Sequence, residues 1–467
     1  MKTKKTVCGL ICLFVTISLS FSNSKLDTDL SYLKRVLSEA YAGYEYNVEQ
    51  GFDFDAAIEN VRNLYLRKSE ESKLPAEVLS TEILTYCINK EILQKLKVPD
   101  NHFAIMSKGK FFMLKRHVWL SSEVYFAKQG DDYIVAFSND SKIKKNSIYT
   151  GNPENLFKMI KDNKEYYVFG IQARNNIKEA EISINKNTFK IPVYMGNFAR
   201  EYEPGHVGMQ KTKKTLYLSF SDCLFNGYDR TTHTLLSRKV QDYLLELKKN
   251  SFENVIVDLR GNRGGIVSNI TPVLATLNFE GDYKNLDKVY RKINTMEYTN
   301  FKKSELVDEA SEKYQKDNPA YKTFIVEDST TEYYRNNRVT EYNFEPSYKG
   351  NLIILCDFNS ASASELFIAY SYIFENVYLI GTNSSGTIDF GGVFDYYLPE
   401  SDIMLHLASG SLKNSDFLQK NPHWHGDTKG FYPDYWCTDS SLLPTLVAIT
   451  KDKKLKKSLR GLHKQLL

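Results

Sequence analysis

The chain has 467 residues, and its 61 Lys and Arg against 57 Asp and Glu give a formal net charge of +4 at pH 7. Acidic and basic residues alternate along it, so we find neither a basic stripe typical of nucleic-acid binding nor an acidic tail typical of disorder. The length is enough for two or three domains and a sizeable core.

The first 24 residues have the pattern of an export signal. Three lysines precede the apolar stretch VCGLICLFVTISL, and SFSNS supplies small residues for cleavage near Ser22 or Ser24. The apolar stretch is short for a membrane span, and no later segment approaches one. We therefore expect residues 1–24 to be a signal peptide. The mature chain is then expected to be periplasmic or extracellular, with no membrane span.

Four cysteines follow this signal: Cys87, Cys223, Cys356 and Cys437. No two are close enough for the spacing of metal ligands, so we expect neither a metal nor another cofactor. One or two disulfides are compatible with an exported protein, but the sequence does not indicate their pairing.

Residues 25–106 are predicted to be an N-terminal helical region. The segments DLSYLKRVLSEAYAGY, FDAAIENVRNLYLRK and PAEVLSTEILTYCINKEILQKL each place apolar residues at three- and four-residue steps. Residues 107–205 change to alternation, as in VYFAKQGDDYIVAFSN and EAEISINKNTFKIPVY, which predicts a small β-rich module. We expect one helical piece in this module, NPENLFKMIKD at 152–162.

Residues 206–467 alternate predicted strands and helices. NVIVDL, NLIILCDF and VYLIGT are predicted buried strands, and LLSRKVQDYLLELKKN and ELFIAYSYIF are predicted helices. This alternation is typical of an α/β core with mostly parallel strands. A polar, Tyr- and Lys-rich insertion at 278–349 interrupts it, and loops of that length are usually functional or mobile.

Two strand-to-helix turns in this core are unusual. NSASASELFIAY sets small residues and three serines where a helix begins, which suits either ordinary capping by Ser360 or Ser364 or a hydroxyl that must stand clear. VIVDLRGNRGG spaces glycines after a buried strand, which suits either a tight turn or amides that stabilise negative charge. Taken together, a serine and exposed amides are what acyl transfer requires.

DLRGNRGG, then SASASE and LIGTNSSGT, and the closing KGFYPDYW resemble the S41 serine peptidase family, which contains the C-terminal processing (tail-specific) proteases and the tricorn core protease. The resemblance covers nearly the whole mature chain, is strong over 215–436 and is weak over the β-rich module. It implies a mostly parallel core of the ClpP/crotonase type, a PDZ-like module at 107–205, and polypeptide substrates.

The resemblance also implies roles for individual residues. The serine that opens Ser-Ala-Ser-Glu, Ser362, corresponds to the nucleophile. The oxyanion hole would use the amide of Ala363 and that of Gly264 or Gly265. Ser360 and Ser364 would then be structural, and Glu365 a residue of the helix start.

The C-terminal processing branch uses a lysine base, but Thr387 occupies its place here and no lysine occurs between Tyr370 and Leu412. The tricorn-like branch uses a histidine in an Asp-x-His element, which VPDNHFAI matches with His102. That branch places an acidic residue where GDTKGFYPD has Asp427. The implied triad is therefore His102, Ser362 and Asp427, in which the imidazole is the base and the carboxylate holds its tautomer.

His423 and His425 in NPHWHGD are the competing bases; as a pair they lack a third metal ligand. We expect an exported serine endopeptidase that works through an acyl-enzyme at Ser362. The alternative is a catalytically inactive binder of peptide or ligand with the S41 fold, which the missing lysine favours. The natural substrate and the oligomeric state do not follow from the sequence.

Overall fold

The computed structural model describes residues 25–75, 78–114, 116–174, 176–195, 206–225, 228, 233–249, 251–277, 289–292, 333–336, 348–372, 374–413, 418, 420–437 and 439–459. They form two compact units, and each is described by itself. The first unit holds the described residues within 1–114, 287–338 and 389–415, and the second those within 115–286, 339–388 and 416–467. The predicted signal at 1–24 and most of the predicted insertion lie outside the described residues.

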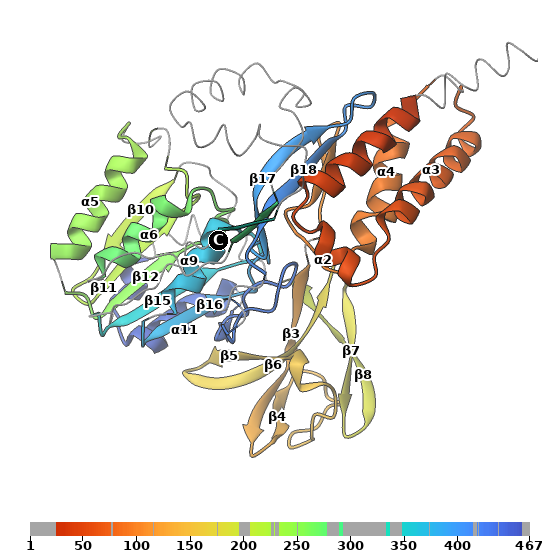
Figure 1. The fold of residues 1–467 in the computed structure, drawn as a ribbon. Coiled ribbons are helices and arrows are strands. Elements are labelled where there is room, and N and C mark those ends of the chain that lie inside the picture. Colours follow the sequence, from red (N-terminus) through yellow and green to blue (C-terminus); the bar gives the residue numbers. More distant parts are fainter. Residues whose placement is uncertain are drawn as a thin grey trace, which may run out of the picture. The chain divides into compact units, whose positions relative to one another are not determined.

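The first unit combines helices with one antiparallel sheet (Figure 1). Residues 25–40 are helical, and they are followed by α2 (Tyr44–Glu49), α3 (Phe54–Glu71), α4 (Thr81–Glu91) and η1 (Leu93–Lys95). The sheet has the order β14 (Tyr333–Asn336), β13 (Val289–Lys292), β18 (Met404–Ser411), β1 (Ala104–Ser107) and β2 (Lys110–Phe112), and β17 (Phe390–Tyr397) also pairs with β18.

Apolar periodicity and capping explain how the first unit forms. α3 begins after Asp53, whose carboxylate accepts the amide hydrogen of Ala56 at 2.9 Å. The buried face of this helix, which includes Val61, joins one apolar cluster with Ile105 of β1 and Leu405 of β18. The helices and the sheet therefore share a single core.

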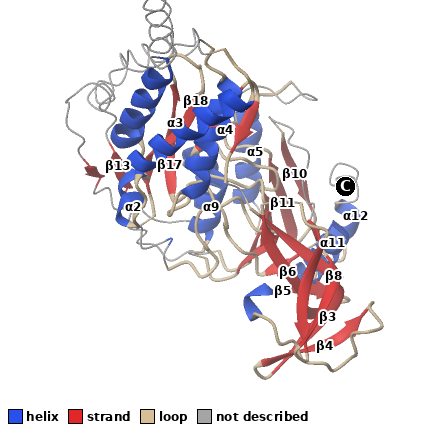
Figure 2. Cartoon of the chain, turned by 90° about the vertical axis from the view of Figure 1, so that its right-hand side faces the viewer, coloured by secondary structure: helices blue, strands red, loops and turns tan. Residues whose placement is uncertain are grey.

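The β-rich part of the second unit contains two sheets, whose strands are drawn in red in Figure 2. The first has the order β4 (Asp132–Ser138), β3 (His117–Gln129), β6 (Lys164–Ala173) and β5 (Leu156–Lys161), and β9 (Tyr194–Met195) pairs with β3. The second is the hairpin of β7 (Glu179–Ile184) and β8 (Asn187–Pro192).

The helix predicted at 152–162 is wrong. Only η2 (Pro153–Asn155) is helical there, and the rest of the segment is strand β5. LFKMIK places apolar residues on both faces, a pattern that a short helix and a buried strand share. Antiparallel pairing with β6, from Leu156 opposite Phe169 to Lys161 opposite Lys164, decides in favour of the strand.

The remaining part of this unit is a sheet with helices packed on it. Its strand order is β10 (Val207–Lys211), β11 (Thr215–Phe220), β12 (Asn254–Asp258), β15 (Asn351–Cys356), β16 (Val377–Gly381) and β19 (Tyr435–Trp436). The β10–β11 pair is antiparallel and the other four pairs are parallel. Figure 1 shows α5 (Leu236–Lys249), α6 (Val267–Thr276) and α9 (Ala363–Ser371) on one face and α11 (Asp439–Thr450) on the other.

The expectation of a mixed α/β fold is confirmed. Across all described sheets the pairings are mostly antiparallel, since the parallel pairs belong to the single sheet that contains β12 and β15. The four cysteines of the described chain are buried and free. No described helix is both long and apolar enough to cross a membrane.

Candidate active site

The two unusual turns lie side by side in the second unit. β12 and β15 are parallel neighbours, with Asp258 opposite Leu355, so the two strands end at the same edge of the sheet. The glycine turn (residues 259–265) follows β12, and the serine turn (residues 357–362) follows β15. Ligands of parallel sheets gather at this edge.

Hydrogen bonds hold the two turns together. The carbonyl of Asn262 accepts the amide of Ala361 at 3.0 Å and the Ser364 hydroxyl at 3.1 Å. Asp357 accepts the amide of Gly261 at 3.0 Å, and the hydroxyl of Ser360 donates to the carbonyl of Leu259 at 2.7 Å. Both serines are fully buried, so their hydroxyls serve this packing.

Asn262 was not singled out from the sequence. It is buried, its side-chain oxygen accepts the amide of Gly264 at 2.9 Å, and its side-chain nitrogen donates to the carbonyl of Phe220 at 3.0 Å. An Asn two residues before a glycine is a signal for this kind of side-chain turn, so the Asn-Arg-Gly order of the motif could have revealed it.

Ser362 has a strained backbone. Its φ of 54° and ψ of −116° lie in a region that residues other than glycine rarely adopt. Ser362 stands directly before the first residue of α9. Such a conformation costs on the order of 1–3 kcal/mol and persists where the surroundings impose it, often at functional sites. A strand-to-helix turn of this kind presents a serine hydroxyl outward in hydrolases.

The three backbone amides expected to form the oxyanion hole differ in whether they already donate a hydrogen bond. The amide of Gly264 is already used, because it donates to Asn262. For Gly265 and Ala363 no hydrogen bond from the backbone amide is found within the described part of the chain. Ala363 opens α9, where the helix dipole favours negative charge.

Glu365, three residues after Ser362, is fully buried. Its carboxylate accepts the amides of Ser362 at 3.2 Å, Gly386 at 2.7 Å and Thr387 at 2.7 Å, and the hydroxyl of Ser384 at 2.5 Å. Burial raises the pKa of Glu365 to about 7, although all four hydrogen bonds favour the charged form. This carboxylate is therefore more than the helix-start residue expected from the sequence.

Asp427 is buried and supports the same segment. Its Oδ1 accepts the amide of Ile388 at 3.0 Å, and the amide of the next residue, Thr428, donates to the carbonyl of Gly386 at 2.8 Å. The hydroxyl of Thr387 donates to Ser385 at 2.8 Å. The position of the family lysine thus carries a buried hydroxyl without an ammonium group.

His102 lies in the first unit, in a turn that Asp100 closes by accepting the amides of His102 at 2.7 Å and Phe103 at 3.2 Å. Its Nδ1 is buried and has no hydrogen-bond partner among the described residues. Burial, with a contribution from the charge of His406, lowers the pKa of His102 to about 4. Burial also raises the pKa of Asp100 to about 7.

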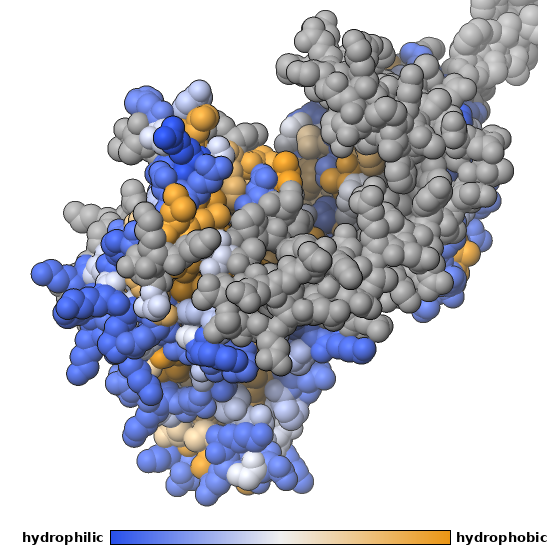
Figure 3. Space-filling model, turned by 60° about the vertical axis from the view of Figure 1, so that its left-hand side comes forward, coloured by the Kyte–Doolittle hydropathy of each residue, from blue (hydrophilic) through white to orange (hydrophobic). Residues whose placement is uncertain are grey.

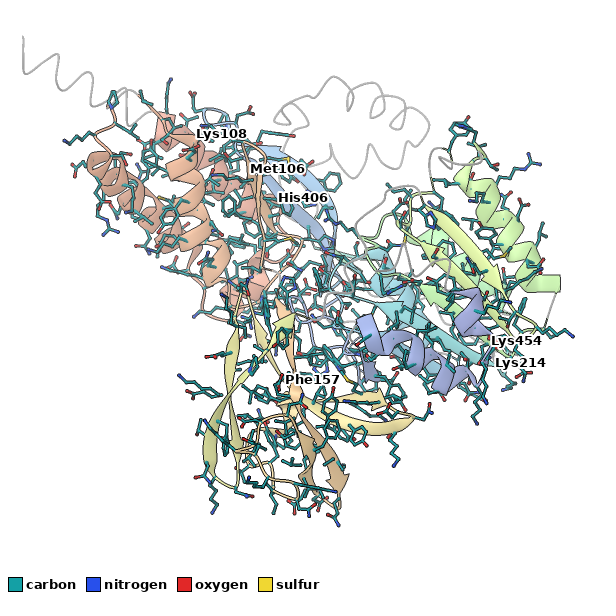
Figure 4. All side chains as sticks on the ribbon, turned by 180° about the vertical axis from the view of Figure 1, so that it is seen from behind. Met106, Lys108, Phe157, Lys214, His406 and Lys454 are labelled. Carbon is teal, nitrogen blue, oxygen red and sulfur yellow. The ribbon has the colours of Figure 1, made fainter. Side chains whose placement is uncertain are left out.

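The first unit holds a second histidine, His406, and no sequence motif indicates a role for it. It lies on β18 (Figure 4), and its Nδ1 is 2.6 Å from Oδ1 of Asp395, its direct cross-strand partner on β17. A carboxylate in this position orients an imidazole. The residues are eleven apart, so only the hairpin register of β17 and β18 brings them together.

The competing histidines of the second unit are engaged in packing. His423 has Nδ1 2.9 Å from the carbonyl of Tyr432 and Nε2 3.5 Å from the carboxylate of Asp434. His425 is exposed and lies over the ring of Tyr432, with ring centroids 3.9 Å apart. Within the described ranges, no three His, Cys, Asp or Glu residues are grouped to hold a metal ion.

Exposed apolar side chains flank the glycine turn. Leu224 and Ile266 are 41% and 51% exposed. They adjoin Gly265, because Cys223 and Gly265 form a parallel bridge and the amide of Ile266 donates to the carbonyl of Cys223 at 3.2 Å. Figure 3, coloured by hydropathy, shows where apolar residues reach the surface. Such side chains beside the amides can contact an extended polypeptide.

Several solved structures resemble the chain. They include mature CPAF complexed with lactacystin (12% identity, covering 96% of this chain and 99% of that chain, TM-score 0.45) and the photosystem II D1 C-terminal processing protease (13%, 95% and 97%, TM-score 0.35). The tricorn protease is a further one (14%, 94% and 37%, TM-score 0.33). No curated protein matches the sequence.

The family comparison gives a direct result. Residues 225–435 match peptidase family S41, and this range contains both the glycine turn and the serine turn. Residues 225–435 are therefore a region of peptidase family S41, and this match supports a serine-type peptidase.

Proposed function

We propose that the chain is an exported serine endopeptidase that hydrolyses polypeptides through an acyl-enzyme at Ser362, with His102 as the base. The observation that carries this proposal is the pairing of two features in the second unit. Ser362 stands on a strained strand-to-helix turn, and that turn packs directly against a glycine turn in which the amide of Gly265 donates to no other described group.

The chemical roles follow from this arrangement. Ser362 Oγ attacks the carbonyl carbon of the scissile bond while the base takes its proton. The amides of Gly265 and Ala363 then stabilise the oxyanion of the tetrahedral intermediate. The protonated base donates to the leaving amine as the C–N bond breaks, and water hydrolyses the resulting ester by the same steps.

His102 is the proposed base because its environment keeps the imidazole neutral at pH 7, as a base must be. A pKa of about 4 is low for this task. We assign to Asp427 the role of holding the imidazole in the tautomer that accepts the proton of Ser362. Within the second unit, Asp427 is itself held in place by accepting the amide of Ile388.

The remaining parts of the proposal concern delivery of the substrate. Residues 1–24 would direct export and be removed. The PDZ-like module at 107–205 would bind the substrate tail as an added strand at a sheet edge, which leaves the residues upstream of the tail to enter the site. Residues 25–106 and 206–467, with the insertion at 278–349, complete the proposed domain organisation.

The test is labelling of the purified mature protein with a fluorophosphonate, together with hydrolysis of an unfolded polypeptide. We expect one labelled serine, Ser362, and loss of both labelling and hydrolysis in Ser362→Ala. Ser360→Ala and Ser364→Ala are controls in the same turn and should keep the label. If the label were found on Ser360 or Ser364 of the wild type, that serine would be the nucleophile. A folded protein with neither labelling nor hydrolysis would favour the inactive binder.

A further inference from the structure

We propose that Glu365 is a positioning residue for the nucleophile, because its carboxylate ties the backbone of Ser362 to the segment formed by residues 384–387. The inference rests on the proposed role of Ser362. It concerns a buried carboxylate that does not itself touch the substrate and acts through the conformation of its neighbours.

Donors surround both oxygens of this carboxylate. Oε2 accepts the amides of Ser362 and Thr387, and Oε1 accepts the amide of Gly386 and the hydroxyl of Ser384. A carboxylate offers about four lone-pair sites, so its capacity is filled. Three of the four donors are backbone amides, which means that the carboxylate determines the path of two chain segments.

Ordinary helix capping explains only part of this arrangement. In a capping box the Glu side chain accepts one amide, that of the N-cap residue, here Ser362. The donors from residues 384–387 lie 19 to 22 positions further along the chain and are not part of a cap. A fully buried carboxylate is also costly, and none of the described ion pairs supplies it with a cation. The cost is explained if the carboxylate maintains the strained turn of the nucleophile.

The ionised form of the Glu365 carboxyl group is the one that matches its four hydrogen-bond donors. Three of the four partners are backbone amides, which can only donate, so a protonated carboxyl or a Gln amide could direct a hydrogen only at the Ser384 hydroxyl and would lose amide partners. Burial raises the pKa of Glu365 to about 7. The four groups that face it do not titrate, and the nearby Cys356 thiol stays neutral because burial raises its pKa well above the ordinary value. The hold on Ser362 should therefore loosen as pH falls through about 7, whereas a base with the pKa of His102 would lose activity at a lower pH.

The experiment compares Glu365→Gln with Glu91→Gln, a matched change at another buried glutamate, which lies on α4 and pairs with Lys95. For Glu365→Gln we expect kcat to fall about 100-fold, as for a displacement of roughly 1 Å, with KM nearly unchanged. Wild type should lose kcat and the rate of fluorophosphonate labelling below about pH 7, and the variant should lack this acid limb. Glu91→Gln should behave as wild type.

Hydrogen exchange supplies a readout that does not depend on activity. In wild type, protection of the amides of Gly386 and Thr387 should fall as pH decreases through about 7, and in Glu365→Gln it should be low throughout. The wild-type measurement remains decisive if the variant does not fold. Protection that is constant with pH, or a folded Glu365→Gln enzyme with wild-type kcat and acid limb, would overturn the inference.

The two proposals fail in different ways. If Ser362→Ala retained hydrolysis, the role of Ser362 would be lost, whatever Glu365 does. If wild-type Ser362 is labelled but Glu365→Gln is labelled at the same rate and with the same pH profile, the nucleophile stands and only the positioning role of Glu365 is rejected.

Discussion

A Cβ atom added to Gly264 would lie 2.9 Å from Cβ of Ser362, a residue 98 positions further along the chain. It would also lie 2.7 Å from the carbonyl oxygen of Ala361 and 2.9 Å from the amide nitrogen of Ala363. Gly264 has a φ of +94°, so both its conformation and its surroundings require glycine. The two turns therefore touch at the proposed nucleophile.

Gly264→Ala should fold but lose at least about 100-fold in kcat, because the added methyl group displaces the serine turn. Gly130→Ala is the matched control, since Gly130 also has a positive φ of 63° but has nothing within 4 Å of an added Cβ. Both variants carry a similar backbone penalty, and only the first should lose activity. Steady-state hydrolysis and the labelling rate of Ser362 provide the measurement; equal losses in the two would contradict the clash argument.

Local patterns in the sequence predict much of the sheet that contains β12 and β15. Runs such as NVIVDL and NLIILCDF each contain an uninterrupted apolar stretch, as strands buried on both faces do, and these stretches form most of β12 and β15. Because both turns follow such strands, their proximity follows from the parallel pairing of neighbours. The motif also indicates Ser362, whereas its strained φ is visible only in the structure.

Long-range contacts set the limits of sequence reasoning. The partners of Glu365 in residues 384–387 are brought to it by the fold, so the short motif indicates only its place at the helix start. Asp395 and His406 meet through the register of a hairpin. The segment that became β5 shows the same limit, since pairing with β6 outweighed a local pattern that two structures share.

His102→Ala should reduce kcat by about 10⁴-fold or more, close to the effect of Ser362→Ala, because members of a triad act as a unit. His423→Ala and His425→Ala should be much milder, since these rings pack against Tyr432 and its surroundings. His406→Ala is the decisive comparison, measured with the same peptide substrate. A near-normal His102→Ala together with an inactive His406→Ala would transfer the role of base to the imidazole held by Asp395.

Asp427→Asn should cost less than either change in the proposed nucleophile or base, in the range of about 10²- to 10⁴-fold in kcat. The reason is that the carboxylate orients the imidazole and does not exchange the proton, while the Asn oxygen can still accept the amide of Ile388. Asp427→Ala removes that acceptor as well and should be worse. Equal activity of wild type and Asp427→Asn would remove this residue from the proposed triad.

Arg260→Met should destabilise the second unit by about 3–5 kcal/mol, because it leaves the buried carboxylate of Asp258 without its cation. Arg260 and Asp258 have side chains 1% and 0% exposed, and the guanidinium Nε and Nη2 donate to the two carboxylate oxygens at 2.9 and 2.7 Å. Urea unfolding followed by tryptophan fluorescence reports on this unit, since Trp119, Trp424 and Trp436 all belong to it.

The control for Arg260 is Lys214→Met. Lys214, labelled in Figure 4, pairs with Glu253 at 2.7 Å, but the two side chains are 52% and 61% exposed. Exposed pairs contribute about 0–1 kcal/mol, so this variant should unfold close to wild type. A comparable loss of unfolding free energy in both variants would mean that burial does not make the Arg260–Asp258 pair more important for stability than the exposed pair.

Asp100 and His102 should give opposite pH dependences of stability. Burial raises the pKa of Asp100 from 3.8 to about 7, so between these values the folded chain binds more protons at this site than the unfolded chain, and the contribution to stability falls as pH rises. Burial lowers the pKa of His102 from 6.5 to about 4, so its contribution rises with pH over that window. As pH rises from 4 to 7, the free energy of unfolding of Asp100→Asn should therefore increase relative to that of wild type. Over the same pH rise, the free energy of unfolding of His102→Ala should decrease relative to that of wild type. Denaturant unfolding followed by far-ultraviolet circular dichroism at several pH values measures both slopes. Slopes of the same sign would show that the two groups do not titrate as their burial requires.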